Sequence, residues 1–165
     1  MKTFVLLVFS IFSPLVSFGQ TSLKEGPKIN GIGLGARREQ VVAKFGKPLA
    51  ETKKKADECV GGTEVTLQYP GLKFRLWDDP DNPKSFTVGW FEVRSARWNV
   101  SGAKIGDTTV AVRNLFGVRT TQQTIRKTGS VTWFYEMDEE VSPGTTNFTF
   151  RNGKLVGITT LWLLC

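Results

Sequence analysis

The sequence predicts an α+β fold: a tandem repeat in which each unit is a helix plus an antiparallel four-stranded sheet, with one sheet face partly open. Gly31 falls on Gly102 and Phe45 on Phe116 at a shift of 71 residues, so INGIGLGARREQVVAKFG and VSGAKIGDTTVAVRNLFG follow one pattern. Runs that alternate apolar and polar residues come after each copy, as strands require. One helix covers only one face of such a sheet, so the other face should stay partly open.

Residues 1–19 are expected to be a secretory signal peptide. Lys2 gives a positive start, FVLLVFSIF is apolar, and small residues precede a cleavage site after Gly19. A transmembrane anchor is the weaker alternative, because the apolar run is about half of the roughly 20 residues that a span needs. We therefore expect a secreted or periplasmic chain, with no transmembrane segment in its mature form and a polar lead segment at 20–28.

The first repeat unit covers residues 29–99. A helix of about ten residues is predicted after Gly35, with Val41 and Phe45 on one apolar stripe. Arg37 occupies the N-cap position, where no short polar side chain satisfies the first amides, so this helix should start weakly. Gly46 is expected to end the helix as a left-handed cap. The expected strands cover 49–57, 65–69, 72–77 and 86–98.

The second unit covers residues 100–165 and repeats this plan. Thr108 is the predicted N-cap of its helix, Val112 and Phe116 form the apolar stripe, and Gly117 is the stop. Asn152-Gly153 is typical of a tight hairpin turn into the last strand. The expected strands cover 118–127, 131–136, 146–151 and 155–164.

The repeated pattern, G-x-[ST]-x-x-x-V-x-x-x-[FL]-G followed by V-T-x-x-Y, resembles the superfamily of the beta-lactamase inhibitory protein. It is also similar to the single-unit BamE/SmpA-type lipoproteins. The residues that carry the resemblance are Gly35, Val41, Phe45, Gly46, Tyr69, Gly106, Thr108, Val112, Phe116, Gly117 and Tyr135. The resemblance implies an extracytoplasmic location, no cofactor, and binding through an open sheet face and its loops. The chain has no lipobox cysteine, and none of the inhibitor's binding residues is matched by position.

The absence of histidine removes Ser-His-Asp and Cys-His catalysis as well as histidine metal sites. Two cysteines, Cys59 and Cys165, could form one disulfide in an oxidising compartment. Two free thiols, or a bond from Cys165 to another chain, are the alternatives, because spacing in the sequence says nothing about distance in space. No metal site is expected.

The glycine-rich start of the first unit superficially resembles a phosphate-binding loop. The interval Gly31-x-Gly33-x-Gly35 differs from G-x-G-x-x-G, and Lys104 replaces Gly33 in the second copy. Helix punctuation explains the repeated glycines without a nucleotide. We therefore expect no cofactor.

Two acidic segments, DDPDNP from Asp78 and EMDEE from Glu136, are read as solvated loops. The first lacks the glycine and the distal glutamate of a calcium-binding EF-hand loop. Carboxylates from the two segments would have to converge in a cleft to hydrolyse a glycoside.

Removing Lys2 from the 22 basic residues leaves 21 against 15 acidic residues, a net charge of +6. A basic secreted protein could contact nucleic acid, anionic lipid or an acidic protein partner. The positive charge is scattered and no arginine-rich arm exists, so we expect no nucleic acid partner and a solvated face at the single run, Lys53-Lys54-Lys55.

Large aromatic side chains beside basic ones mark the candidate binding residues. Trp77 shares strand parity with Lys73 and Arg75, and Phe134 points opposite to its neighbours Trp133 and Tyr135. We therefore expect a secreted or periplasmic, non-enzymatic protein-binding module, a monomer or weak oligomer, with an inhibitor-like or envelope-associated role. The inhibitor role follows from the resemblance alone. The alternative is a secreted glycan-binding module or a carboxylate-dependent hydrolase.

Overall fold

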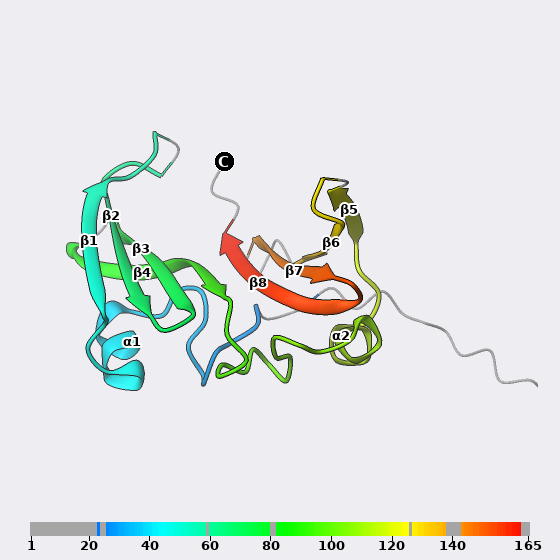
Figure 1. The fold of residues 1–165 in the computed structure, drawn as a ribbon. Helices are drawn as coiled ribbons and strands as arrows, with labels where there is room; N and C mark the ends of the chain where they lie inside the picture. The colour runs from blue at the N-terminus through cyan, green and yellow to red at the C-terminus, as the bar shows by residue number, and fades with distance from the viewer. Residues whose placement is uncertain are drawn as a thin grey trace, which may run out of the picture.

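A computed structural model describes residues 23, 26–58, 60–79, 82–125, 127–137 and 143–162. The expected signal peptide, Cys59 and Cys165 lie outside these described residues. The elements, in chain order, are α1 (Arg38–Phe45), β1 (Ala50–Lys55), β2 (Thr63–Tyr69), β3 (Leu72–Asp79), β4 (Asn82–Val93), α2 (Thr109–Phe116), β5 (Thr121–Ile125), β6 (Ser130–Glu136), β7 (Gly144–Arg151) and β8 (Lys154–Trp162) (Figure 1).

The strands of the described residues form one eight-stranded antiparallel sheet in the order β1-β2-β3-β4-β8-β7-β6-β5. The expected tandem of a helix plus a four-stranded sheet is therefore wrong: the described part of the chain is mainly β, with one continuous sheet and two helices of eight residues each. The finding that overturns it is the pairing of β4 with β8, which runs from Trp90↔Leu161 to Val93↔Ile158. An unpaired strand edge leaves backbone N–H and C=O groups without hydrogen-bond partners. The pairing of β4 with β8 gives these groups partners on both strand edges.

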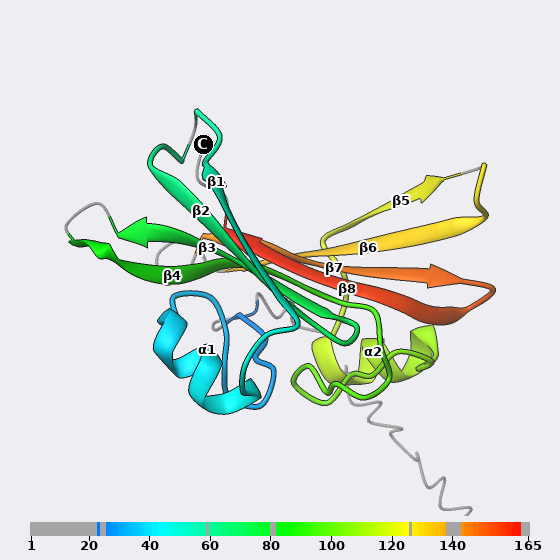
Figure 2. The same ribbon diagram turned by 60° about the vertical axis from the view of Figure 1, so that its left-hand side comes forward.

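Both helices lie on one side of the sheet, and the sheet bends away from them (Figures 1 and 2). Apolar side chains from the helices and from the sheet surface below them form the buried core. It includes Val41, Val112, Phe116, Leu67, Phe74, Leu76, Phe91, Phe148 and Ile158. The other sheet face is concave, and no helix of the described residues lies on it (Figures 1 and 2).

The two helices start differently, as the sequence predicts. The Thr108 side chain accepts a hydrogen bond from Ala111 N at 3.2 Å, whereas the Arg37 side chain makes no cap bond. Gln40 Oε1 instead accepts from Arg37 N at 2.7 Å, which satisfies one backbone amide before α1. The first helix therefore depends on a glutamine that comes after its cap.

Both helices end at the predicted glycines, but the expected left-handed cap geometry is wrong. Gly46 has φ 78° and ψ −164°, and Gly117 has φ 77° and ψ −151°, so φ is positive while ψ is extended. A tyrosine fixes each end: the hydroxyls of Tyr69 and Tyr135 donate to the carbonyl oxygens of Gly46 and Gly117, each at 3.1 Å. A free helix carbonyl thus gains a partner from the sheet.

Candidate functional site

The four candidate residues lie on the concave face of the sheet. On β3, Leu72, Phe74 and Leu76 are buried toward the helices, so Lys73, Arg75 and Trp77 point the opposite way. We call this helix-free surface the open face. Its first half is the part on β1–β4, and its second half is the part on β5–β8.

Strand register connects β3 to Phe134 on β6. Lys73 pairs with Glu92, Glu92 with Thr159, Thr159 with Asn147, and Asn147 with Phe134. Directly paired residues face the same side of a sheet, so this row runs along the open face from β3 to β6. Three strands separate Lys73 from Phe134, so the structure puts the candidates on one surface without bringing all four into contact.

Arg75 is held in place by a tryptophan that sequence reasoning missed. Its guanidinium carbon lies 4.5 Å from the ring centroid of Trp90, the residue paired with it on β4. Val88 and Trp90 would share a face in an unbroken strand, but a register shift at Gly89 puts Val88 in the core and Trp90 on the open face. The glycine inside this apolar run was the available signal, because glycine within a strand often marks a bulge.

Trp77 packs against the same bulge. A β-carbon at residue 89 would overlap Cζ3 and Cε3 of the Trp77 ring. On the other side of β3, Trp77 pairs with Glu64, a carboxylate whose residue is only 2% exposed. Glu64 keeps two polar partners, the Thr66 hydroxyl at 3.2 Å and the Lys54 ammonium at 3.5 Å. The buried acid is thus satisfied, which removes most of the cost of its burial.

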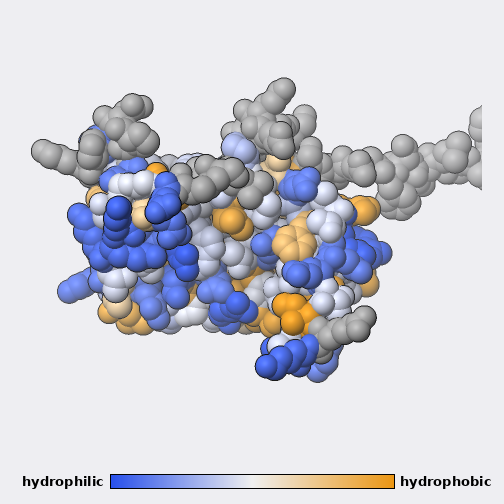
Figure 3. Space-filling view, turned by 90° about the horizontal axis from the view of Figure 1, so that it is seen from above, coloured by the Kyte–Doolittle hydropathy of each residue, from blue (hydrophilic) through white to orange (hydrophobic). Residues whose placement is uncertain are grey.

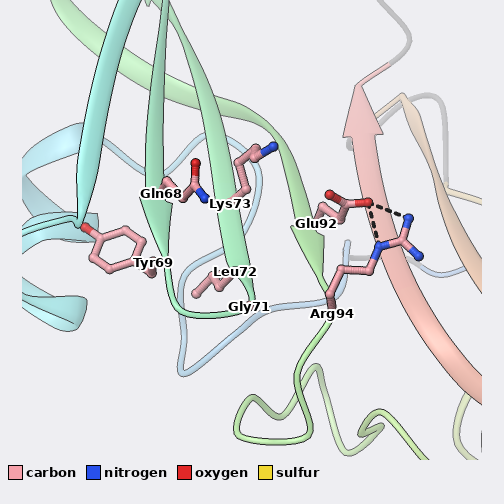
Figure 4. A pocket seen from close by; sticks show the side chains of 7 residues that line it. All are labelled: Gln68, Tyr69, Gly71, Leu72, Lys73, Glu92 and Arg94. Atoms are coloured by element: carbon pink, nitrogen blue, oxygen red, sulfur yellow. Dashed lines mark hydrogen bonds and ion pairs between the residues drawn. The ribbon is translucent and has the colours of Figure 1, made fainter.

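A small pocket of about 190 Å³ opens near the open face, where β2 and β4 end and β3 begins (Figure 4). Its lining residues are Gln68, Tyr69, Gly71, Leu72, Lys73, Glu92 and Arg94. Glu92 and Arg94 form an ion pair at 2.7 Å, and the Arg94 guanidinium lies over Gly157 of β8. Among the described residues, no ion pair joins Lys73 or Arg75 to an acid, and the carboxylate of Glu92, opposite Lys73 on β4, pairs with Arg94.

The half around Phe134 is polar and uncharged near its centre. Thr145 Oγ1 donates to Asn147 Oδ1 at 3.1 Å, and the hydroxyls of Thr132 and Thr149 lie 3.2 Å apart. Phe134 pairs with Asn147 and is partly exposed among these groups. Seen from above, hydrophobic residues on this surface stand in separate small groups among hydrophilic ones (Figure 3).

Two tyrosines on the helix side of the sheet, Tyr69 and Tyr135, have a raised pKa. Burial raises the pKa of Tyr69, with Arg38 opposing the rise and Glu51 adding to it. Burial likewise raises the pKa of Tyr135, against the charges of Arg119 and Arg113. Both phenols donate structural hydrogen bonds to the ends of the helices.

The described carboxylates of the two acidic segments, Asp78 and Glu136, do not converge as a hydrolase would need. Asp78 lies one residue before the end of β3, where its Oδ1 accepts from Thr63 N at 3.0 Å, while Glu136 ends β6. Three strands lie between them, or about 19 Å at the usual strand spacing. Paired glycosidase carboxyls are about 5–10 Å apart. Asp81 and residues 138–140 lie outside the described residues. Among the residues that the structure describes, no group of three or more acidic, cysteine or histidine side chains could hold a metal ion.

The part of the chain that the structure describes contains no helix with the length and hydropathy of a membrane span.

Comparison with known proteins gives structural matches only. No family model matches the chain, and no curated protein gives a significant match. An extracellular protein containing an SCP domain, from Bacillus anthracis, matches with a TM-score of 0.50 and 14% identity over 99% of this chain and 50% of that one. This chain thus spans half the length of that structure, and the likeness concerns the fold alone.

Two other solved structures are more distant. A DUF4309 family protein from Bacillus subtilis has a TM-score of 0.42 and 12% identity, covering 77% of this chain and 78% of its own. A candidate beta-lactamase inhibitor protein from Streptococcus mutans has a TM-score of 0.32 and 16% identity, covering 79% and 91%. The resemblance to the beta-lactamase inhibitory protein and to BamE-type lipoproteins stays a prediction.

Proposed function

We propose that this chain is an exported, non-enzymatic protein-binding module whose partner lies against the open face. The observation that carries the proposal is the continuous register from Lys73 to Phe134, on the face that the helices leave uncovered. The helices and the core cover the opposite face of the sheet. A protein that approaches the open face therefore contacts it from one side, where Lys73, Arg75, Trp77 and Phe134 lie.

The chemistry of this face suits an acidic protein surface. Arginine and large aromatic residues are enriched among the residues that dominate interface energies. Stacking on Trp90 holds Arg75 before a partner arrives, which lowers the entropy cost of binding. Since no ion pair joins Lys73 or Arg75 to an acid among the described residues, carboxylates of a partner would complement them.

The role of such binding is inferred from the resemblance. An inhibitor would use the open face to cover a specific enzyme, and an envelope-associated module would use it to hold an assembly partner. Export is supported by the predicted signal peptide, and the Bacillus anthracis structural match is named as an extracellular protein. The assignment of residues 29–99 and 100–165 as two units remains part of this proposal.

The test is affinity capture with the mature chain from its native envelope or culture medium, with bound proteins identified by mass. A combined Arg75→Gln, Trp77→Leu, Phe134→Ala variant is run beside the wild type. Arg97→Gln with Val110→Ser is the matched control, since Arg97 stacks on Trp98 of the core and Val110 is an exposed α2 residue. Capture that disappears only in the open-face variant supports the proposal.

A glycan array run with the same three proteins separates the alternative. Saturable binding to one glycan class, abolished by the open-face substitutions, would replace the protein partner with a carbohydrate. The hydrolase alternative has no support from Asp78 and Glu136, because three strands separate them.

A further inference from the structure

Two arginines converge on one tryptophan at the corner between α2 and β5. Arg113 comes from the last turn of α2 and Arg119 from the loop after it. Their guanidinium carbons lie 5.6 Å and 4.8 Å from the ring centroid of Trp133. Trp133 is 5% exposed and packs against Phe150 with centroids 4.7 Å apart, so its ring is a fixed platform. It points to the helix side of the sheet, away from the open face.

Neither arginine is neutralised within the described residues. The ion pairs there join Arg38 to Glu51, Lys54 to Glu64 and Arg94 to Glu92, and no hydrogen bond from Arg113 or Arg119 accompanies their ring contacts. Two guanidinium groups over one ring repel each other. Each also keeps its five N–H donors for a ligand.

A hollow lies beside this pair. Its volume is about 580 Å³, and Arg113, Asn114, Gly117, Val118 and Arg119 line it. Volumes of this size are ordinary for small-ligand sites. The two positive charges also act on the buried Tyr135 beneath, where both oppose the rise in its pKa. The corner therefore combines space, unpaired donors and a positive field.

We propose that Arg113 and Arg119 form an oxyanion-binding site that takes the chemistry shared by a partner's carboxylate side chain and a phosphate group. Planar guanidinium groups bind both oxyanions through two parallel hydrogen bonds, and stacking on Trp133 sets their orientation in advance. A bound anion would also relieve the repulsion between the two arginines. The site lies on the opposite side of the sheet from the open face, so it is a second binding function that does not depend on the first.

The first half of the chain lacks this pair. At the shift of 71 residues, Arg113 corresponds to Val42 and Arg119 to Pro48. The arginine that α1 does carry, Arg38, is held by Glu51 at 2.8 Å. The oxyanion site is thus specific to one corner of the molecule.

The test is a nuclear magnetic resonance titration that follows the Nε–H signals of Arg113 and Arg119 and the indole N–H of Trp133. The probes are inorganic phosphate and N-acetylglutamate amide, each added at constant ionic strength. The variant is Arg113→Gln with Arg119→Gln, and the control is Arg97→Gln, which removes a lone arginine from Trp98. Arg113→Lys with Arg119→Lys keeps the charge but loses the planar fork.

We expect saturable shifts of all three signals in the wild type and in Arg97→Gln. The dissociation constant should rise at least tenfold in the glutamine variant and rise measurably in the lysine variant. Tighter saturation by phosphate would identify a phosphate site, and tighter saturation by the carboxylate probe would identify an acidic partner. Shifts that stay linear with both probes, or that persist in the glutamine variant, would overturn the proposal.

Discussion

The ring of Trp77 lies against the backbone of Gly89 on the neighbouring strand, at the bulge that turns Trp90 onto the open face. Only a residue without a side chain leaves room for the indole here. The contact places a large aromatic side chain beside the Arg75–Trp90 stack. On the other side of β3, Trp77 pairs with the buried Glu64.

Gly89→Ala tests this packing. Gly89 does not have a positive φ, so alanine brings no backbone strain and the only new feature is its overlap with Trp77. We expect a loss of about 1–3 kcal/mol in the free energy of unfolding, as overpacking typically costs. In a Trp77→Leu background the loss should be smaller, because the clash is gone. Urea denaturation of the four proteins measures it, and equal losses in both backgrounds would show that the ring is not the obstacle.

Thr108→Ala tests the asymmetry of the helix starts. Removing the hydroxyl that accepts from Ala111 N should lower the free energy of unfolding by about 0.5–2 kcal/mol. Arg37→Ala is the matched change at the other helix and should stay within about 0.5 kcal/mol, because the Arg37 side chain makes no cap bond. Thermal or urea unfolding compares them, and a larger loss from Arg37→Ala would contradict the assigned caps.

Stability should fall at alkaline pH through Tyr69 and Tyr135. Burial raises the pKa of each above its ordinary value of 10.0, so above that pH the folded state keeps protons that the unfolded state releases. The stabilisation is complete below pH 10 and is lost as pH rises through the folded pKa values. Urea unfolding from pH 9 to 11 should show the loss, and a Tyr69→Phe, Tyr135→Phe variant should show a shallower one. An unchanged slope in that variant would assign the pH dependence to other groups.

Local features of the fold were predictable because they depend on neighbouring residues. The glycine stops, the Thr108 cap and the faces of β2, β3 and β6 follow from propensity and alternation. The pairing of β4 with β8 was not, because alternation defines the faces of a strand and leaves open which distant edge it joins. A tandem of separate sheets was the wrong expectation for that reason.

For the candidate site, too, the face on which each residue lies was predictable, and the long-range pairing of the strands was not. Parity alone placed Lys73, Arg75 and Trp77 on one face, and register across five strands was needed to connect them with Phe134. Trp90 was missed because a bulge changes parity after one residue. The meeting of Arg113 and Arg119 over Trp133 depends on how α2 packs on β6, which no local pattern contains.

The affinity of the captured partner for three proteins tests the open face most directly: the wild type, the Arg75→Gln, Trp77→Leu, Phe134→Ala variant, and the Arg97→Gln, Val110→Ser control. Titration calorimetry should give a dissociation constant at least 100-fold larger for the open-face variant than for the wild type. The reason is that the loss of each interface anchor costs about 1–2 kcal/mol or more of binding free energy. The control should bind like the wild type, and all three proteins should be folded at the temperature of the titration. An open-face variant that binds the partner as tightly as the wild type would contradict the account.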